Sequence, residues 1–364
     1  MKSALPDHRF TVRQPVGPGA LRALLCTILA CLATLASAAD LHVGPGAHYP
    51  RLADAIAAAQ DGDTVLVAPG TYAGDVAVIK QRKLTIRGQG QRPVLLANGQ
   101  HAEGKAILVV RDGEVLIENL EFRGARVPDI NGAGIRFERG TLTVRGCNFI
   151  DNENGILTSN HGDARLQIVD SYFAQAPDRP DSLDHLVYVG RIAEVMITGS
   201  RFHQGRTGHL IKSRAKVSRL TYNLIADGPA GQASYEVDLP QGGLAVLIGN
   251  VIVQGAHTQN PVVVSFGAEG KAWPGSALYM AHNTLVNEHW PGAWFLRVWR
   301  DKLPPSWPNT QQPPRRRTTI CRPPPNARWP KRLNAARPPG RWRCPPSWAG
   351  ATGRNPCAMA IGKR

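Results

Sequence analysis

The sequence lacks several features on which common protein classes depend. Residues 40–300 contain one cysteine, Cys147, so this part of the chain has no cysteine pair for a disulfide and no zinc-site spacing. It also has no run of about 10 to 12 residues with the hydrophobic pattern that helical repeats need. Residues 40–300 also carry no net charge, since they hold 25 basic and 25 acidic groups. The total of +16 comes from residues 301–364, which supply +13, and from residues 1–39, which supply +3. The charge of residues 40–300 therefore gives no reason to expect a nucleic-acid partner.

The C-terminal segment lacks acidic residues instead. Residues 303–364 contain no Asp or Glu but 14 prolines, four tryptophans and three cysteines, and their hydrophobic periodicity disappears. Disordered tails are usually poor in Trp and Cys. The composition leaves two alternatives, which are readthrough of a GC-rich gene in a shifted frame and a basic arm that binds an acidic polymer. We therefore treat residues 301–364 as a separate tail, disordered or out of frame.

What the sequence does contain is a short motif that recurs seven times between residues 117 and 285. Each copy has an apolar residue, two further residues, a middle position, one further residue and a second apolar residue. The middle positions are spaced by 27, 24, 29, 23, 27 and 33 residues, and a period of this size is typical of a solenoid. They are Leu120, Cys147, Ser171, Ser200, Asn223, Asn250 and Asn283.

The repeat predicts an all-β fold, a right-handed parallel β-helix over residues 39–300. Each unit holds short β-rich runs separated by Gly, Asn and Asp, and a second strand follows each motif. One coil per repeat would place equivalent strands in register as parallel sheets. The small and amide middle residues would form an internal ladder at a corner, where backbone groups need partners. A β-sandwich is the alternative, but it would not repeat one motif seven times.

The first 38 residues predict a signal peptide. An apolar run over residues 20–39 ends in Ala36-Ser37-Ala38, which fits a signal-peptidase site. The alternatives are a transmembrane anchor, for which the run is barely long enough, and a lipoprotein site at Cys31. We expect a periplasmic or secreted protein with no membrane contact after cleavage.

Residues 41–75 resemble the opening of pectin-lyase-like right-handed parallel β-helix proteins. The resemblance rests on the segments Val43–Gly46, Gly62–Val65 and Pro69–Tyr72, with a short alanine-rich helix at residues 52–59. Apolar residues of that helix recur at i, i+3, i+4 and i+7, so one face can be buried. We expect this helix to cap the open end of the solenoid. The resemblance extends over about residues 41–300 and implies the fold more than an activity.

Candidate functional residues concentrate in three consecutive coils between residues 184 and 240. Stacking of their second strands places His185 over His209 over Tyr235, and Tyr188 over Lys212 over Asp238. Arg191 and Arg214 fall near the same edge, offset by one position. The pattern Leu210-Ile211 does not show whether Lys212 points outward.

This group suits β-elimination on a uronic-acid polysaccharide, which needs a cation at the carboxylate, a base and an acid. Lys212 is the candidate base, His209 a second base or acid, and Arg214 or Arg191 the carboxylate ligand. Glu236 and Asp238 could hold Ca²⁺, although the ion requires more oxygens. We assign substrate binding to His185, Tyr188, Arg191 and Tyr235. Trp273 could stack on a sugar or lie in a plain exposed loop, and Glu269 reads as a solvated turn.

The segment Ile211-Lys212-Ser213 resembles the strand that carries the catalytic lysine in the chondroitinase B and alginate lyase family. The resemblance implies that Lys212 is catalytic. Two departures weaken the resemblance. A glutamate usually opens the family's motif, but His209 stands near that position here, and the next coil lacks the family's arginine motif. The rival hypothesis is a non-catalytic carbohydrate-binding or structural β-helix, in which Lys212 and Asp238 form only a cross-strand ion pair. Either way we expect a polysaccharide partner and a monomer.

Overall fold

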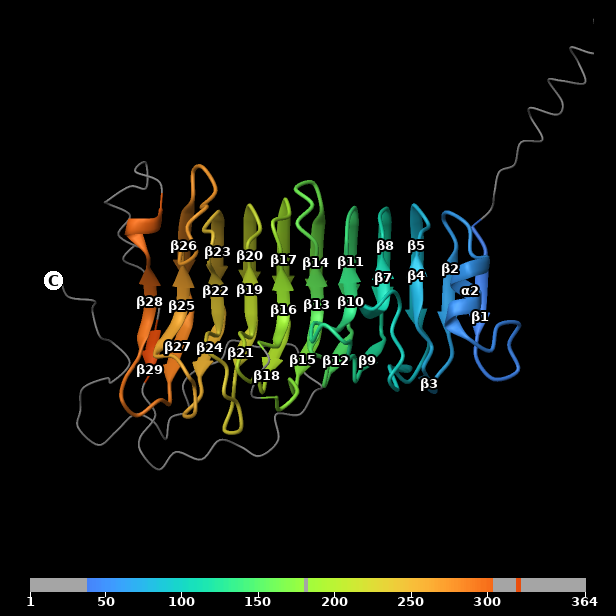
Figure 1. Ribbon diagram of the computed structural model, residues 1–364, viewed down its shortest axis with the longest axis horizontal. Helices are drawn as coiled ribbons and strands as arrows, with labels where there is room; N and C mark the ends of the chain where they lie inside the picture. Colours follow the sequence, from blue (N-terminus) through green and yellow to red (C-terminus); the bar gives the residue numbers. More distant parts are fainter. Residues whose placement is uncertain (1–37, 180–182, 304–318, 322–364) are drawn as a thin grey trace, which may run out of the picture. The chain divides into compact units, whose positions relative to one another are not determined.

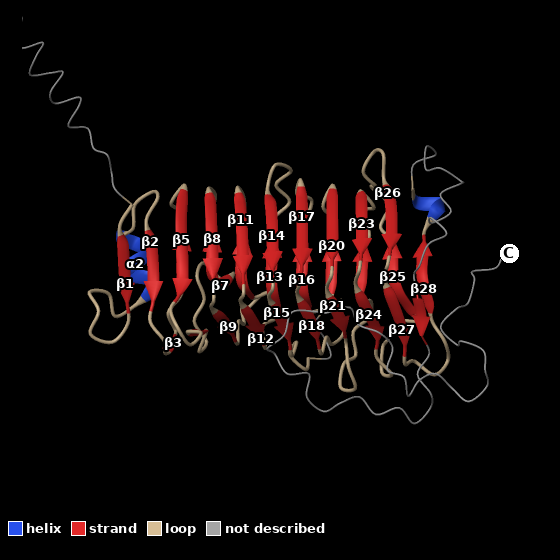
Figure 2. Ribbon diagram, turned by 180° about the vertical axis from the view of Figure 1, so that it is seen from behind, coloured by secondary structure: helices blue, strands red, loops and turns tan. Residues whose placement is uncertain are grey.

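The computed structural model describes residues 38–179, 183–303 and 319–321, and the predicted signal peptide lies outside them apart from residue 38. Residues 39–303 coil into a parallel β-helix with three parallel sheets, which confirms the predicted fold class. Figure 1 and Figure 2 show the strands of successive coils side by side in each sheet.

Sheets A and B have ten strands each and sheet C has nine among the described residues. Sheet A contains β1 (Asp40–Val43), β2 (Thr64–Val67), β5 (Lys83–Gly88), β8 (Glu114–Glu118), β11 (Thr141–Arg145), β14 (Arg165–Val169), β17 (Glu194–Thr198), β20 (Val217–Thr221), β23 (Leu244–Ile248) and β26 (Ala277–Ala281). Sheet B contains β3 (Thr71–Ala73), β6 (Val94–Leu96), β9 (Glu121–Arg123), β12 (Asn148–Ile150), β15 (Tyr172–Ala174), β18 (Arg201–His203), β21 (Leu224–Ala226), β24 (Val251–Gln254), β27 (Thr284–Asn287) and β29 (Thr319–Cys321). Sheet C contains β4 (Ala77–Ile79), β7 (Ala106–Val110), β10 (Ala133–Phe137), β13 (Asn154–Thr158), β16 (His185–Val189), β19 (Ile211–Ser213), β22 (Val237–Leu239), β25 (Val262–Phe266) and β28 (Trp294–Val298).

Alternation along the strands puts apolar side chains inside. In sheet A, Leu142 of β11 pairs with Leu166 of β14, and Val144 pairs with Ile168, and all four are buried. The intervening positions are partly exposed or exposed. Each coil therefore buries its inward side chains on those of its neighbours.

The repeated motif forms the predicted ladder at the corner between sheets A and B. Backbone N–H groups donate to the next ladder side chain, from Ser200 to Asn223 at 2.9 Å and from Asn223 to Asn250 at 3.0 Å. The residue before each ladder position has a positive φ, between 48° and 69°. This left-handed residue turns the chain sharply, and the ladder side chains supply partners for the backbone groups that the bend frees.

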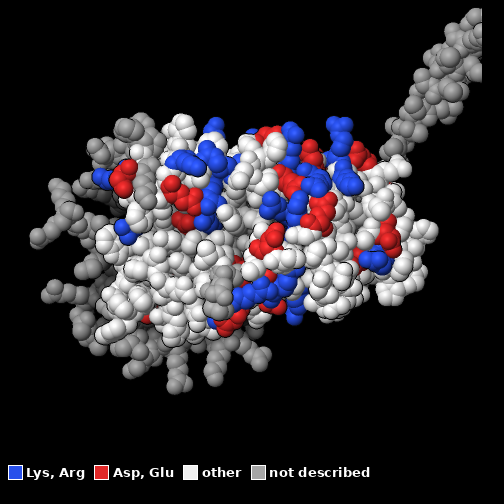
Figure 3. Space-filling view, in the orientation of Figure 1, with Lys and Arg blue, Asp and Glu red and all other residues white. Residues whose placement is uncertain are grey.

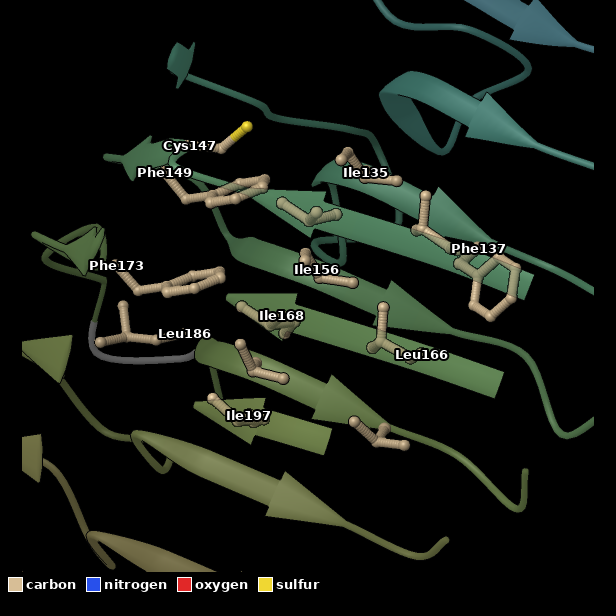
Figure 4. Close-up of a cluster of buried hydrophobic side chains, with 14 of the residues drawn as sticks. Ile135, Phe137, Cys147, Phe149, Ile156, Leu166, Ile168, Phe173, Leu186 and Ile197 are labelled. Carbon is tan, nitrogen blue, oxygen red and sulfur yellow. The ribbon is translucent and has the colours of Figure 1, made fainter. Parts of the chain in front are cut away.

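The second apolar residue of each motif forms a column inside sheet B. The rings of Phe149 and Phe173 stack with centroids 4.5 Å apart, and Phe173 and Phe202 follow at 5.0 Å. Figure 4 shows Phe149 and Phe173 one above the other beside buried Cys147 and the inward residues of the other sheets. Burial raises the pKa of the Cys147 thiol to about 12, so this cysteine is an inert core residue.

A short helix, α2 (Leu52–Ala58), occurs where the sequence predicts one and buries Leu52, Ala55 and Ile56. Both carboxylate oxygens of Asp75, from the turn before β4, accept hydrogen bonds from the first turn of this helix. The role of α2 as a cap stays a prediction. No helix among the described residues is long and apolar enough to cross a membrane.

Part of the C-terminal tail is described. Arg300–Lys302 forms one turn of 3-10 helix, and β29 pairs in parallel with β27 in sheet B. The three residues of β29 therefore form a strand, where the sequence analysis expected a tail that is disordered or out of frame. Residues 304–318 and 322–364 lie outside the described ranges.

Candidate functional site

The predicted cluster lies on the outer face of sheet C. Tyr188 of β16 pairs with Lys212 of β19, and Lys212 pairs with Asp238 of β22, as the stacking predicts. Lys212 points outward, because its strand neighbours Ile211 and Ser213 are buried while Lys212 stays partly exposed. The register that the apolar pair Leu210-Ile211 left open is thereby fixed.

A column of rings runs along the same face. The centroids of His185 and His209 are 4.8 Å apart, and Tyr235 follows His209 at 4.8 Å. Burial, assisted by the charge of Lys212, lowers the pKa of His209 to about 3, and burial lowers the pKa of His185 well below its usual value. Both imidazoles are therefore neutral near pH 7. His209 places Nε2 3.4 Å from Oδ2 of Asp238, whose pKa burial raises to about 6.

The two cations of the cluster share one carboxylate, that of Glu269. Arg214 Nε donates to Glu269 Oε2 at 2.6 Å, and Arg214 Nη2 contacts the other carboxylate oxygen. Lys212 Nζ lies 3.3 Å from Glu269 Oε1, and Arg214 Nη1 donates to the hydroxyl of Tyr188. Although burial acts to raise it, the hydrogen bonds and charges of Arg214 and Lys212 lower the pKa of Glu269 to about 2. Glu269 is therefore a permanent anion at the centre of the cluster.

Arg191 is held by the loop that carries Glu269. Its guanidinium carbon lies 3.9 Å from the ring centroid of Trp273, and its Nη1 donates to Lys271 O at 3.0 Å and to Gln241. The indole N–H of Trp273 donates to Arg214 O at 2.9 Å. Arg191 thus covers one face of the Trp273 ring, and Trp273 is partly buried instead of lying in a plain exposed loop. Stacking of Trp273 on a sugar stays a prediction.

Glu269 is the residue that the sequence reasoning missed. Glu269 lies in a turn and is exposed, as predicted, but that interpretation missed its ion pairs with two predicted site residues that are 55 and 57 positions away. One signal was present in the sequence. The spacing of 33 residues between Asn250 and Asn283 is the longest in the ladder and indicates an inserted loop in this coil. The insertion does not reveal where the loop folds.

A hollow of about 360 Å³ opens beside the cluster on the same face. Its lining includes Tyr188, Arg214 and Arg136 of β10. Among the described residues, the lining contains no carboxylate, and Arg136 Nε is buried without a hydrogen-bond partner. The remaining lining residues are Ile130, Asn131, Asn154, Leu157, Thr158, Ser159, Asn160, Leu183 and Gly190.

Glu236 and Asp238 are not brought together. Both carboxylate oxygens of Glu236 are buried without a partner among the described residues, whereas Asp238 faces His209. In the part of the chain that the structure describes, no group of three or more His, Cys, Asp or Glu side chains is placed to hold a metal ion. The pair therefore does not offer the six or more oxygen ligands that Ca²⁺ takes.

Comparison of the chain with known protein families, with curated proteins and with solved structures gave no match. Fold and site together define a parallel β-helix protein with a charged cluster and an adjoining polar hollow on sheet C. Figure 3 shows that basic and acidic side chains lie beside each other on the face drawn, instead of forming a field of one sign.

Proposed function

We propose that this protein binds an acidic polysaccharide along the outer face of sheet C and cleaves it by β-elimination. One observation carries the proposal: Tyr188 contacts both Lys212 and Arg214 beside a hollow whose lining, among the described residues, has two arginines and no carboxylate. The stacked strands form an elongated surface, which suits a polymer.

The hollow has the chemistry to hold a uronate. Arg136 lines the hollow, and its guanidinium can donate a charge-assisted hydrogen bond to a carboxylate bound there. The amides of Asn131, Asn154 and Asn160 can bind sugar hydroxyls. A neutral sugar offers Arg136 only uncharged acceptors, which form weaker hydrogen bonds than a carboxylate does, so we expect preference for acidic chains.

We assign three roles in the reaction. Arg214 binds the carboxylate of the uronate and stabilises the negative charge that develops there. Lys212 removes the proton from the carbon next to that carboxylate, and the electron pair forms a carbon–carbon double bond. The bond to the glycosidic oxygen then breaks, and this oxygen takes a proton from the hydroxyl of Tyr188. His209 faces Asp238, so we regard it as a positioning residue. Lys212 acts from beside the hollow, next to the ring of the lining residue Tyr188.

Two features at the N-terminus support an extracellular polysaccharide as partner. The leader at residues 1–38 predicts export, and residues 41–75 resemble the opening of pectin-lyase-like proteins. We therefore include periplasmic or secreted location and membership of that fold group in the proposal.

The test uses the full chain on alginate, pectate and chondroitin and follows the ultraviolet absorbance of an unsaturated uronate. We expect absorbance with the parent and a loss of about 100-fold or more in rate for Lys212→Ala. Lys105→Ala is the matched control, because Lys105 is a partly exposed lysine paired with Glu138 outside the hollow. Equal rates for parent and Lys212→Ala would remove Lys212 from the mechanism.

A non-catalytic binding protein is the second candidate, and the pairing of Glu269 with both Lys212 and Arg214 favours it. A carboxylate next to an amine favours the charged form, which cannot accept a proton. Saturable binding of a uronate polymer without any absorbance change would establish this alternative.

A further inference from the structure

The loop over residues 267–276, here named the Glu269 loop, reaches back from its own coil to the preceding ones. Its backbone is fixed there: Glu269 N–H donates to Pro240 O at 2.9 Å and Trp273 N–H donates to Gln241 O at 3.1 Å. Gly270 and Gly275 have φ near +68°, and an added Cβ would meet nothing within 4 Å at either. These glycines are therefore required by the turns of the loop and not by close packing.

Within this fixed loop, the side chain of Glu269 occupies Arg214 in the way a ligand carboxylate would. The Nε and Nη2 atoms of Arg214 face one carboxylate oxygen each, which is the two-pronged geometry preferred by guanidinium and carboxylate. Lys212 adds a third contact from the side. The cations are nearly covered, at 14% exposure for Lys212 and 17% for Arg214, whereas Glu269 keeps 32%.

We infer that Glu269 is a built-in competitor that fills the carboxylate site formed by Arg214 and Lys212, and that an acidic ligand must displace it. The inference deepens the proposed function and rests on it, because it assumes that Arg214 binds the ligand's carboxylate. Since the edge of Arg214 formed by Nε and Nη2 can hold one carboxylate at a time, Glu269 and a ligand carboxylate exclude each other there.

Displacement requires only the side chain of Glu269 to rotate. The backbone hydrogen bonds to Pro240 and Gln241 hold the loop, and the indole of Trp273 anchors it to Arg214 O. Gln241 Nε2 lies 3.3 Å from Glu269 Oε2 and remains on the loop side of the cluster. A ligand would thus meet a loop whose backbone is already in place, and only the carboxylate of Glu269 would have to leave Arg214.

The experiment measures binding of a uronate oligomer to the full chain by calorimetry, for the parent, Glu269→Gln and Glu118→Gln. Glu118 is the matched control, because it pairs with Arg87 and Arg145 on sheet A and its replacement removes the same charge. We expect Glu269→Gln to bind about fivefold more tightly than the parent, because the substitution weakens the partly exposed ion pairs that Glu269 forms with Arg214 and Lys212. Glu118→Gln should change affinity by less than about twofold. Circular dichroism checks that each variant is folded.

The outcomes separate this inference from the proposed function. Parent binding with equal or weaker binding by folded Glu269→Gln would overturn the competitor role and leave the proposed function standing. Tighter binding by both glutamine variants would assign the effect to overall charge and would also overturn it. No binding by any of the three proteins would reject the proposed function itself.

Discussion

Asn250 shows how one side chain connects three coils. Its Oδ1 accepts from the backbone N–H of Asn223 at 3.0 Å, and its Nδ2 donates to Leu220 O at 2.8 Å. Its own N–H donates to Asn283. All these groups are buried, so water cannot replace the partner that a substitution removes.

We therefore predict that Asn250→Ala lowers the free energy of unfolding by about 3 kcal/mol, because a buried donor and a buried acceptor lose their partners. Asn148→Ala serves as control, since the amide of Asn148 bonds only to Glu121 on a partly exposed surface. Chemical denaturation of both variants gives the comparison. Equal losses would contradict a special role for the ladder.

Glu236 is a carboxyl group in an apolar column. Ile211, Val237 and Val264 are register partners, so the residues that precede them, Leu210, Glu236 and Val263, stack as well. Burial, with the charge of Asp227, raises the pKa of Glu236 well above its usual 4.5. Since the folded state then holds a proton that the unfolded state releases, stability falls as pH rises above about 4.5.

Replacement of Glu236 by leucine should remove this cost. We expect Glu236→Leu to be more stable than the parent by roughly 1–3 kcal/mol near pH 8. The gain should shrink near pH 4, where both folded and unfolded parent are protonated to similar extents. Thermal unfolding at the two pH values provides the measurement, and a gain independent of pH would show that Glu236 is not protonated in the folded state.

At the scale of elements, α2 depends on a carboxylate from another part of the chain. Asp75 accepts from Leu52 N–H at 2.5 Å and Ala53 N–H at 2.9 Å, and it is buried. The N–H groups of the first helical turn have no acceptor within the helix, and the residue at the helix start, Arg51, offers no side-chain cap. Asp75 supplies acceptors for two of these groups.

Asp75→Ala should therefore weaken α2 by about 1 kcal/mol and speed amide hydrogen exchange in residues 40–67 while the central coils keep their protection. Asp54→Ala is the control within the first turn of the same helix, because Asp54 is exposed. If both variants exchange alike, the Asp75 contacts contribute nothing to the helix.

The sequence was informative about the β-helix because its signals are local and periodic. Ladder positions such as Asn223 and Asn250 repeat at similar spacing, and alternation within each strand decides which side chains face inward. The same logic placed Tyr188, Lys212 and Asp238 in one column. It could not place Glu269, because loop contacts across coils follow no period and depend on where the chain folds back.

The same limit applies to burial. Glu236 follows Tyr235 in a segment that reads as surface strand, yet β22 begins only at Val237. The irregular residue before that strand turns into the core, and no single-sequence pattern marks the irregularity. With continued alternation Glu236 would lie on the same face as Asp238, as a shared calcium site requires.

At the scale of the whole β-helix body, the central claim is that sheet C recognises a carboxylate-bearing polymer. The most direct measurement compares the affinity of the full chain for a polyuronate and for the same polymer with its carboxyl groups reduced to alcohols. We predict saturable binding of the polyuronate that weakens with salt, little binding of the reduced polymer, and weaker polyuronate binding by Arg136→Gln. Equal affinity for the two polymers, or no affinity for either, would contradict the account.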